Sequence, residues 1–325
     1  MYILVCFMVK LSLPSLQEIR DAQERLETIT IHTPLIKYDE ISQIYLKPET
    51  LQPVKSFKLR GVFNAAACLS KKQREKGLST MSSGNTAIAL GWTGRYFGVP
   101  AKTYVPYTTP SIKIETMESY GMTVVKMQYD EMIEWINEKG WEKEDSNFIH
   151  PWHNRDLLAG HGTMGLEMLA DLPDVETVYV PVGGGGLISG VGNALKLLNP
   201  DVRVVGVESE ACASLYHSFS AGKAVQIHGS ETICDGSNVP MITEELYPLL
   251  RKVVDDSVTV SEKDVKKTVK SLMLKHKLIV EGSGALATTA ALLEPVEDRG
   301  KSVCIISGGS IDTDKIISIL TDASL

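Results

Sequence analysis

The feature that most constrains the fold is a repeated alternation between short apolar runs, rich in β-branched residues, and stretches with helical spacing. The runs have the length of buried strands, and the stretches between them are long enough for crossover helices. Parallel strands require such crossovers, so the order predicts an α/β fold of open, mostly parallel sheets flanked by helices. The predicted strands are Thr103–Val105, Val124–Met127, Thr177–Val182, Val202–Val207 and Val303–Ile306.

The start of the chain predicts an amphipathic helix. Ser15 and Glu18 form a capping box, and apolar residues recur at helical spacing from Leu16 to Ile29. The apolar residues 1–9 have no basic segment or small-residue cleavage site, and they are too few to span a bilayer. We interpret them as a start-site extension or an edge strand, with a cleaved signal as the alternative.

Charge and cysteine content exclude several classes of protein. The 325 residues include 33 Lys and Arg against 40 Asp and Glu, which gives a net charge of −7 and argues against nucleic-acid binding. The five cysteines contain no C-x-x-C pair, which favours reduced thiols over a disulfide framework or a zinc site. We therefore expect a cytoplasmic protein with no membrane partner.

Three segments carry the chemistry. Gly183–Gly186 separates a predicted strand from a helical run, so its backbone N–H groups suit an anion such as phosphate at the positive end of a helix. Ser82–Thr86 presents hydroxyl and N–H groups at another helix start, which suits a carboxylate. Lys58 supplies an amine. A flexible turn, an ordinary N-cap and a surface lysine are the alternative interpretations, but together the segments contain what Schiff-base chemistry requires.

These motifs also occur in a recognisable order. Lys58 within Ser56–Gly61, the Ser82–Thr86 loop, the four glycines, Glu281–Ala285 and Ser307–Gly309 resemble the serine/threonine dehydratase and serine racemase family. The similarity extends from about Ser15 almost to the end of the chain. It implies a pyridoxal 5′-phosphate (PLP) enzyme of the tryptophan synthase β-type fold.

The resemblance also implies roles for individual residues. Lys58 is similar to the lysine that carries the cofactor as a Schiff base and acts as the base, and Ser83 to a serine that faces the opposite side of Cα in racemases. A helix cap is the alternative for Ser83, as it is for Glu281. The residues expected to bind the cofactor are Phe57, Lys58, Asn85, Gly183, Gly184, Gly185, Gly186, Leu187, Glu281 and Ser307, and those expected to bind the substrate are Ser82, Ser83, Gly84, Asn85 and Thr86.

The expected activity is elimination of water from a small β-hydroxy amino acid such as threonine, serine or 3-hydroxyaspartate, giving a 2-oxo acid and ammonia. Racemisation or β-replacement on the same fold is the alternative, and a PLP-binding protein without activity is a further one. Three positions near the site differ from the family pattern. Lys55 replaces a usual glycine, Ser310 replaces a usual asparagine, and Thr86 stands where dehydratases usually have histidine. We expect Arg155 and His153 to be surface groups, with binding of a second substrate carboxylate as the alternative.

A divalent cation site is also part of the resemblance. Its positions correspond to Glu208, Cys212 and Ser214, and Ser214 lacks the usual carboxylate, so we expect a weak or absent site unless Glu210 substitutes. A metal site at His150 and His153 is not expected, because no third ligand is near. The resemblance further implies a homodimer and two lobes, a small mobile lobe of residues 76–152 and a large PLP-binding lobe of residues 1–75 and 153–325.

Overall fold

The computed structural model describes residues 11–325, apart from the side chains of four residues in α6. The interpretation of residues 1–9 falls outside this range. Two sheets form the framework, and all of their strand pairs are parallel except β1 with β2. The larger sheet has the order β1 (Ile36–Lys37), β2 (Ile44–Pro48), β10 (Ser302–Ile306), β7 (Thr177–Pro181), β8 (Arg203–Ser209) and β9 (Asp256–Val260). The smaller sheet has the order β5 (Met122–Met127), β4 (Ala101–Pro106), β3 (Leu78–Met81) and β6 (Asn147–Phe148).

Helices occupy the connections between these strands, as the alternating pattern predicts. The α-helices are α1 (Leu16–Leu26), α2 (Lys58–Cys68), α3 (Lys71–Arg74), α4 (Asn85–Phe97), α5 (Ser111–Ser119), α6 (Tyr129–Asn137), α7 (Arg155–Asp171), α8 (Gly186–Leu198), α9 (Ser214–Ala221), α10 (Tyr247–Val253), α11 (Glu262–His276), α12 (Gly282–Leu293), α13 (Val296–Arg299) and α14 (Thr313–Thr321). Three short 3₁₀ helices are η1 (Glu49–Leu51), η2 (Gly140–Lys143) and η3 (Asp235–Ser237). The five predicted strands, the helix capped by Ser15 and Glu18, and the α/β class are confirmed.

The central strands of the larger sheet, β7 and β10, are buried on both faces. Along β10, Val303 and Ile305 join the apolar core formed with α8 and α10, whereas Cys304 and Ile306 join the core formed with α11 and α12. This alternation follows from the period of two in a strand. Because neither face meets water, the strand reads as one continuous apolar run in the sequence.

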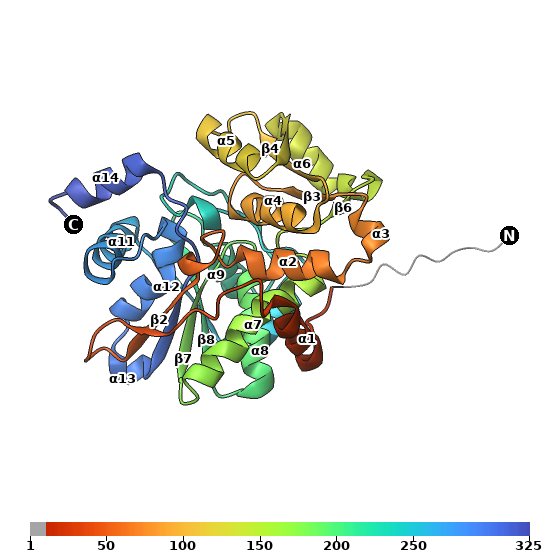
Figure 1. Cartoon of the computed structure of the whole chain (residues 1–325). Helices are drawn as coiled ribbons and strands as arrows, with labels where there is room; N and C mark the ends of the chain where they lie inside the picture. Colours follow the sequence, from red (N-terminus) through yellow and green to blue (C-terminus); the bar gives the residue numbers. More distant parts are fainter. Residues whose placement is uncertain (1–10) are drawn as a thin grey trace.

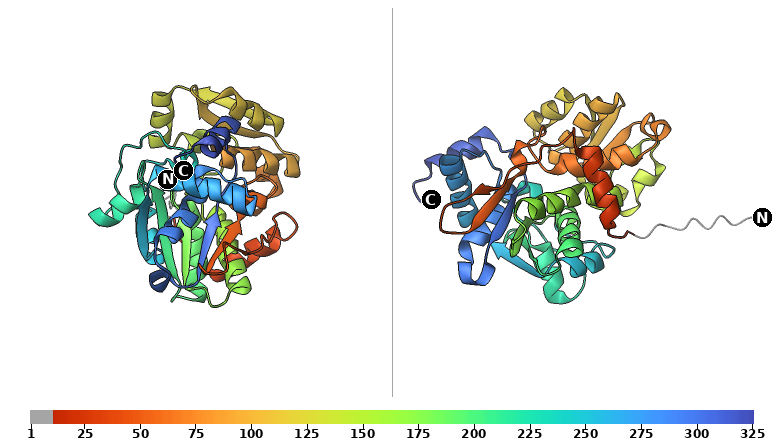
Figure 2. Two further views of the ribbon diagram at one scale, coloured as in Figure 1. Left: turned by 90° about the vertical axis from the view of Figure 1, so that its left-hand side faces the viewer. Right: turned by 60° about the horizontal axis from the view of Figure 1, so that its bottom comes forward.

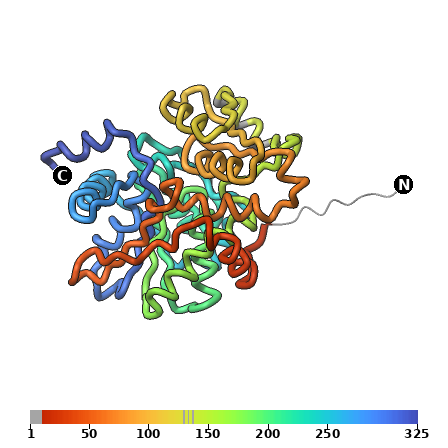
Figure 3. Tube along the Cα trace, in the orientation of Figure 1, coloured from red at the N-terminus to blue at the C-terminus, as the bar shows by residue number. Residues whose placement is uncertain are grey.

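Figure 1 shows the smaller sheet and its helices at the top of the molecule and the larger sheet below, and the turned views of Figure 2 keep the two parts separate. Helix α2 lies between them and contacts both α4 and α7. The trace in Figure 3 passes from α2 into the smaller sheet and returns to the larger one at α7. All strands of the smaller sheet fall within the predicted lobe 76–152, and the boundaries and mobility of that lobe stay predictions.

A buried network of four charged side chains holds α2 in place. The Arg60 guanidinium bonds the Glu49 carboxylate at 2.7 Å and the Glu167 carboxylate at 2.6 Å, and Lys47 bonds Glu167 at 2.6 Å. The two cations and two anions balance, and each is almost fully buried. The network joins β2, η1, α2 and α7, so it fixes the first turn of α2, where Lys58 lies.

Within residues 11–325, no helix is both long enough and apolar enough to cross a lipid bilayer.

Candidate active site

A cavity of about 1030 Å³ contains most of the residues that the sequence singles out. Its wall is formed by loops that follow β3, β7 and β10, together with the starts of α2, α4, α8 and α12. Carboxyl ends of parallel strands and amino ends of helices are where open α/β sheets bind ligands. All predicted cofactor-binding and substrate-binding residues line it: Phe57, Lys58, Ser82, Ser83, Gly84, Asn85, Thr86, Gly183, Gly184, Gly185, Gly186, Leu187, Glu281 and Ser307.

Lys58 enters the cavity from the first position of α2. The segment before it is fixed to the end of β10, because the Phe57 N–H donates to the Ser307 carbonyl at 3.0 Å and the Gly309 N–H to the Lys55 carbonyl at 3.0 Å. Within residues 11–325, the Lys58 Nζ makes no hydrogen bond or salt bridge. It lies 5.0 Å from the centre of the Phe57 ring. Burial lowers the pKa of Lys58 to about 8, although the nearby Glu281 carboxylate opposes this.

The four glycines form a loop between β7 and α8. Gly185 adopts a positive φ of 86°, and a Cβ at Gly184 or Gly186 would overlap Trp152. In the described part of the chain, none of the N–H groups of Gly183–Gly186 donates a hydrogen bond to another residue. The loop therefore presents unused donors to the cavity at the start of a 13-residue helix, an arrangement that fits a phosphate group.

Glu281, Asn85 and Ser310 form a hydrogen-bonded group beside Lys58. The Asn85 amide donates to Glu281 at 2.9 Å, and its oxygen accepts from the Ser310 hydroxyl at 2.7 Å. The Ser310 N–H also donates to Glu281 at 3.0 Å. Burial raises the pKa of Glu281 to about 7, although the bonds from Asn85 and Ser310 favour its charged form. Ser310, a departure from the family pattern, thus orients both neighbouring side chains.

The helix-start alternatives for Glu281 and Ser83 have different outcomes. Glu281 is the N-cap residue of α12, as a helix-start carboxylate would be, but its side chain makes no cap hydrogen bond. The N-cap of α4 is Gly84, and no side chain caps that helix, so the cap interpretation of Ser83 is wrong; Ser83 lines the cavity instead. The Ser82 hydroxyl instead accepts from the Gly84 N–H at 3.2 Å and stabilises the turn.

Arg155 and His153 do not line the cavity, so the structure does not favour the alternative that they receive a second substrate carboxylate. Arg155 begins α7, and its guanidinium pairs with Glu18 of α1 at 2.6 Å. The backbone N–H of His153 donates to the His150 Nδ1 atom at 3.1 Å, so the two residues form a local turn. Arg155 thus takes part in the packing of α7 on α1, and His153 in a local turn.

Glu208, one of the three predicted cation positions, is engaged at the start of helix α9. Glu208 accepts hydrogen bonds from the backbone N–H groups of Leu215 at 2.9 Å and Tyr216 at 2.8 Å, and therefore satisfies the start of α9. Burial raises its pKa to about 7. Among the residues that the structure describes, no group of three or more His, Cys, Asp and Glu side chains is arranged to hold a metal. Binding of a cation at Glu208 and Cys212 stays untested.

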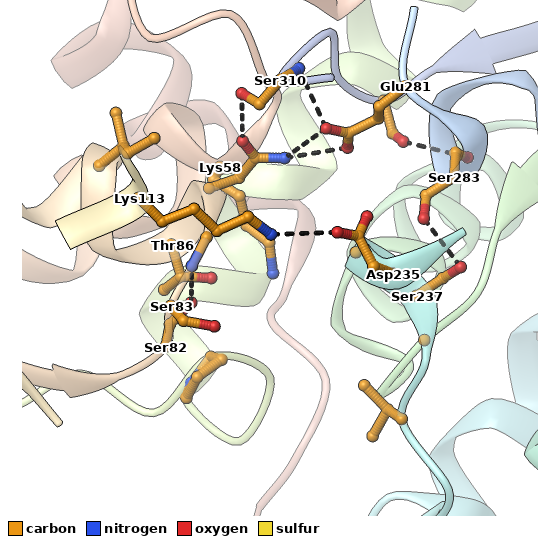
Figure 4. A pocket seen from close by; sticks show the side chains of 18 of the residues that line it. Lys58, Ser82, Ser83, Thr86, Lys113, Asp235, Ser237, Glu281, Ser283 and Ser310 are labelled. Atoms are coloured by element: carbon orange, nitrogen blue, oxygen red, sulfur yellow. Dashed lines mark hydrogen bonds and ion pairs between the residues drawn. The ribbon is translucent and has the colours of Figure 1, made fainter. Parts of the chain in front are cut away.

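Several residues of the cavity were not singled out from the sequence. Figure 4 shows Lys113 of α5 and Asp235 of η3 meeting across the cavity, and Ser237 and Ser283 joined by a hydrogen bond of 3.0 Å. Lys315 of α14 also lines it. Nothing in the local sequence distinguishes these side chains from surface groups. Only the placement of α5 and α14 beside the loops brings them to the site.

Within residues 11–325, the cavity joins an amine without a partner to a set of unused phosphate donors, which is the arrangement of a PLP-binding enzyme. Residues 26–308 match the family described as "Pyridoxal-phosphate dependent enzyme". The chain belongs to this family and, within it, to the serine/threonine dehydratase and serine racemase group of tryptophan synthase β-like fold.

The relatives agree with this placement. The L-threonine ammonia-lyase of Thermotoga maritima is 38% identical over 94% of this chain and 78% of its own length. A catabolic L-threonine dehydratase of Staphylococcus aureus is 34% identical over 94% of this chain and 92% of its own. Among solved structures, maize serine racemase has a TM-score of 0.87 at 30% identity, covering 94% of this chain and 97% of its own.

Proposed function

We propose that this chain is a PLP-dependent ammonia-lyase that removes water from a small β-hydroxy amino acid such as threonine, serine or 3-hydroxyaspartate. The products are a 2-oxo acid and ammonia. The observation that carries the proposal is the Lys58 amine, which has a depressed pKa and no partner within residues 11–325, in one cavity with the free N–H groups of Gly183–Gly186. The threonine ammonia-lyases among the relatives support the reaction type.

The donor set fits the cofactor. The Gly183–Gly186 loop, with Leu187, would hold the phosphate, Phe57 and Asn85 would lie beside the ring, and Ser307 would face its nitrogen. When bound, PLP supplies an aldehyde that takes up an amino group and a conjugated ring that delocalises the electron pair of a broken Cα bond. A serine is a neutral partner for a ring nitrogen, which favours prompt elimination over transamination.

The chain's own residues then perform the proton transfers and the binding. The Ser82–Thr86 loop would receive the substrate carboxylate through its hydroxyl and N–H groups. Lys58 Nζ would take the Cα proton, and its pKa of about 8 leaves a larger neutral fraction near pH 7 than an ordinary lysine has. The β-hydroxyl takes up a proton from the protonated Lys58 amine or from solvent and departs as water. Hydrolysis of the resulting enamine by one water molecule gives the 2-oxo acid and ammonia. Closure of the small lobe, which carries this loop, over the cavity would exclude bulk water.

Racemisation is the second candidate. It is favoured by Ser83, whose hydroxyl lines the same cavity as Lys58, and by the likeness to maize serine racemase. The two reactions differ in product. Purified protein with PLP should release 2-oxo acid from L-serine, L-threonine or a 3-hydroxyaspartate diastereomer, whereas formation of D-serine without 2-oxo acid would overturn the lyase proposal.

The homodimer and the cytoplasmic location stay predictions. The four cysteines in the described part are free, in keeping with a reducing compartment.

A Lys58→Ala variant tests the role of the amine. We expect it to lose covalent attachment of PLP, read by mass after borohydride reduction, and to lose turnover by about 10²–10⁴-fold or more. Lys223→Ala, on an exposed lysine, is the control and should retain both. Full cofactor attachment in the Lys58 variant would contradict the proposal.

A further inference from the structure

Two lysines from different parts of the fold share one carboxylate at the cavity. The Lys113 Nζ of α5 lies 3.0 Å from the Asp235 carboxylate of η3, and the Lys315 Nζ of α14 lies 3.6 Å from it. All three residues line the cavity, and Figure 4 shows the first pair crossing it. Asp235 therefore holds the charged ends of both lysines.

Asp235 also lies close to the reacting groups. A Cβ built on the next residue, Gly236, would come within 3.4 Å of a Glu281 carboxylate oxygen and 3.2 Å of the Ser283 hydroxyl. The Ser237 hydroxyl lies 3.0 Å from that of Ser283. Helix η3 thus packs on the start of α12, beside the hydrogen-bonded group of Glu281, Asn85 and Ser310. A substrate side chain bound in this cavity would therefore interact with the negative charge of Asp235.

The balance of charge around the cavity is negative. Apart from Lys58, its cations are Lys113 and Lys315, whereas its carboxylates are Asp235, Asp312, Asp314 and Glu281. Asp312 is also a partner of Lys315, at 3.9 Å. A second carboxylate on the substrate would meet these acids and find both lysines already paired. A neutral hydroxymethyl or hydroxyethyl group has no such electrostatic cost.

We propose that Asp235 is a specificity-determining residue that excludes amino acids with an acidic side chain. It does so because the ammonium groups of Lys113 and Lys315 are paired with Asp235 and cannot bind a substrate carboxylate. The inference rests on the proposed function and narrows its substrate class to neutral β-hydroxy amino acids such as serine and threonine. It leaves out 3-hydroxyaspartate. Replacing Asp235 by a neutral residue would release Lys113 to receive a substrate carboxylate.

The test measures binding apart from turnover. The holoenzyme is titrated by calorimetry with L-aspartate and L-2-aminobutyrate, neither of which has a β-hydroxyl to eliminate. Wild type should prefer L-2-aminobutyrate, and Asp235→Asn should shift the ratio of the two dissociation constants at least tenfold toward L-aspartate. Adding Lys113→Met to that variant should remove most of the shift. Asp174→Asn, which removes the same charge outside the cavity, should leave the ratio unchanged.

Two results would overturn the specificity proposal: an unchanged ratio in Asp235→Asn, or wild type that binds both amino acids equally. Asp235→Ser replaces Asp235→Asn if the latter does not fold. Release of 2-oxo acid from L-serine and L-threonine by the same wild-type preparation tests the proposed function separately. A shifted binding ratio without such release would support Asp235 as the determinant and reject the lyase. Failure of wild type to bind either ligand would also overturn the specificity proposal, whereas the release of 2-oxo acid decides the proposed function.

Discussion

Individual side chains at the site are set apart by their surroundings rather than by their type. Lys58 is one of many lysines, yet it lies in a cavity wall against the Phe57 ring with a pKa lowered by burial. Lys55 is exposed, and its φ of 61° lies in the left-handed region that glycine adopts freely. A lysine there costs about 1 kcal/mol more than glycine, which accounts for glycine being usual at this position in the family.

The lowered pKa of Lys58 predicts how cofactor capture depends on pH. Only the neutral amine attacks an aldehyde, and the amine becomes neutral as pH rises through about 8. We expect the rate of PLP uptake by apo-protein to rise about tenfold per pH unit below this value and to level off above it. Stopped-flow absorbance measures the rate. A rate that keeps rising to about pH 10, as for an ordinary lysine, would show that the amine is solvated.

At the scale of elements, loops between strands and helices supply the binding groups, and packing behind them fixes their shape. The glycine loop lies against Trp152 on one side and Leu246 on the other, where a Cβ at Gly185 would come within 2.8 Å. Phosphate binding and close packing therefore require glycine at the same positions.

Gly184→Ala tests this dual requirement. Its Cβ would overlap the Trp152 ring, so we expect a loss of about 1–3 kcal/mol in the free energy of unfolding and weaker PLP binding. Adding Trp152→Ala provides room, and the two changes together should cost less than their sum. Chemical denaturation and a fluorescence titration with PLP measure the two effects. Wild-type cofactor affinity in Gly184→Ala would show that the loop has room for a side chain.

The charged network below Lys58 makes a second prediction for the elements. Arg60→Met leaves the carboxylates of Glu49 and Glu167 buried without their shared cation. We expect a loss of about 3–5 kcal/mol in the free energy of unfolding by urea. Arg155→Met, which removes a partly exposed pair with Glu18, should cost about 1 kcal/mol or less. Equal losses in the two variants would mean that burial of the network does not matter.

For the whole molecule, the position of the cavity between two sheets makes closure the expected motion. Helix α5 carries Lys113 on the side of the smaller sheet, while Asp235 and Lys315 belong to segments beside the larger sheet. The predicted small lobe, residues 76–152, contains both α5 and the Ser82–Thr86 loop. Movement of that lobe would bring substrate-binding groups toward Lys58.

Hydrogen exchange of the holoenzyme with L-2-aminobutyrate measures this closure. We expect exchange in residues 81–86 and 111–119 to slow by about tenfold, equivalent to about 1.4 kcal/mol of added protection. Peptides of α13, on the far part of the larger sheet, serve as the control and should not change. Protection confined to the larger sheet would contradict a mobile small lobe.

The sequence by itself determined the class of fold and the chemistry of the loops. A continuous apolar run such as β10 is legible because both faces of the strand are buried, and consecutive glycines or a capping box act through neighbouring backbone atoms. Local rules of this kind need no knowledge of distant residues. The order of the motifs around Lys58 then indicated the cofactor.

Only the tertiary structure decided which distant side chains share the cavity. Asp235, Lys113 and Lys315 come from three separate segments, and their interaction depends on how η3, α5 and α14 pack. The sequence offered Arg155 as an alternative substrate-binding group, but packing of α1 against α7 gives it Glu18 as a partner. Charge acts through space over a few ångströms, so its partners follow from the packing of whole elements and not from their spacing in the chain.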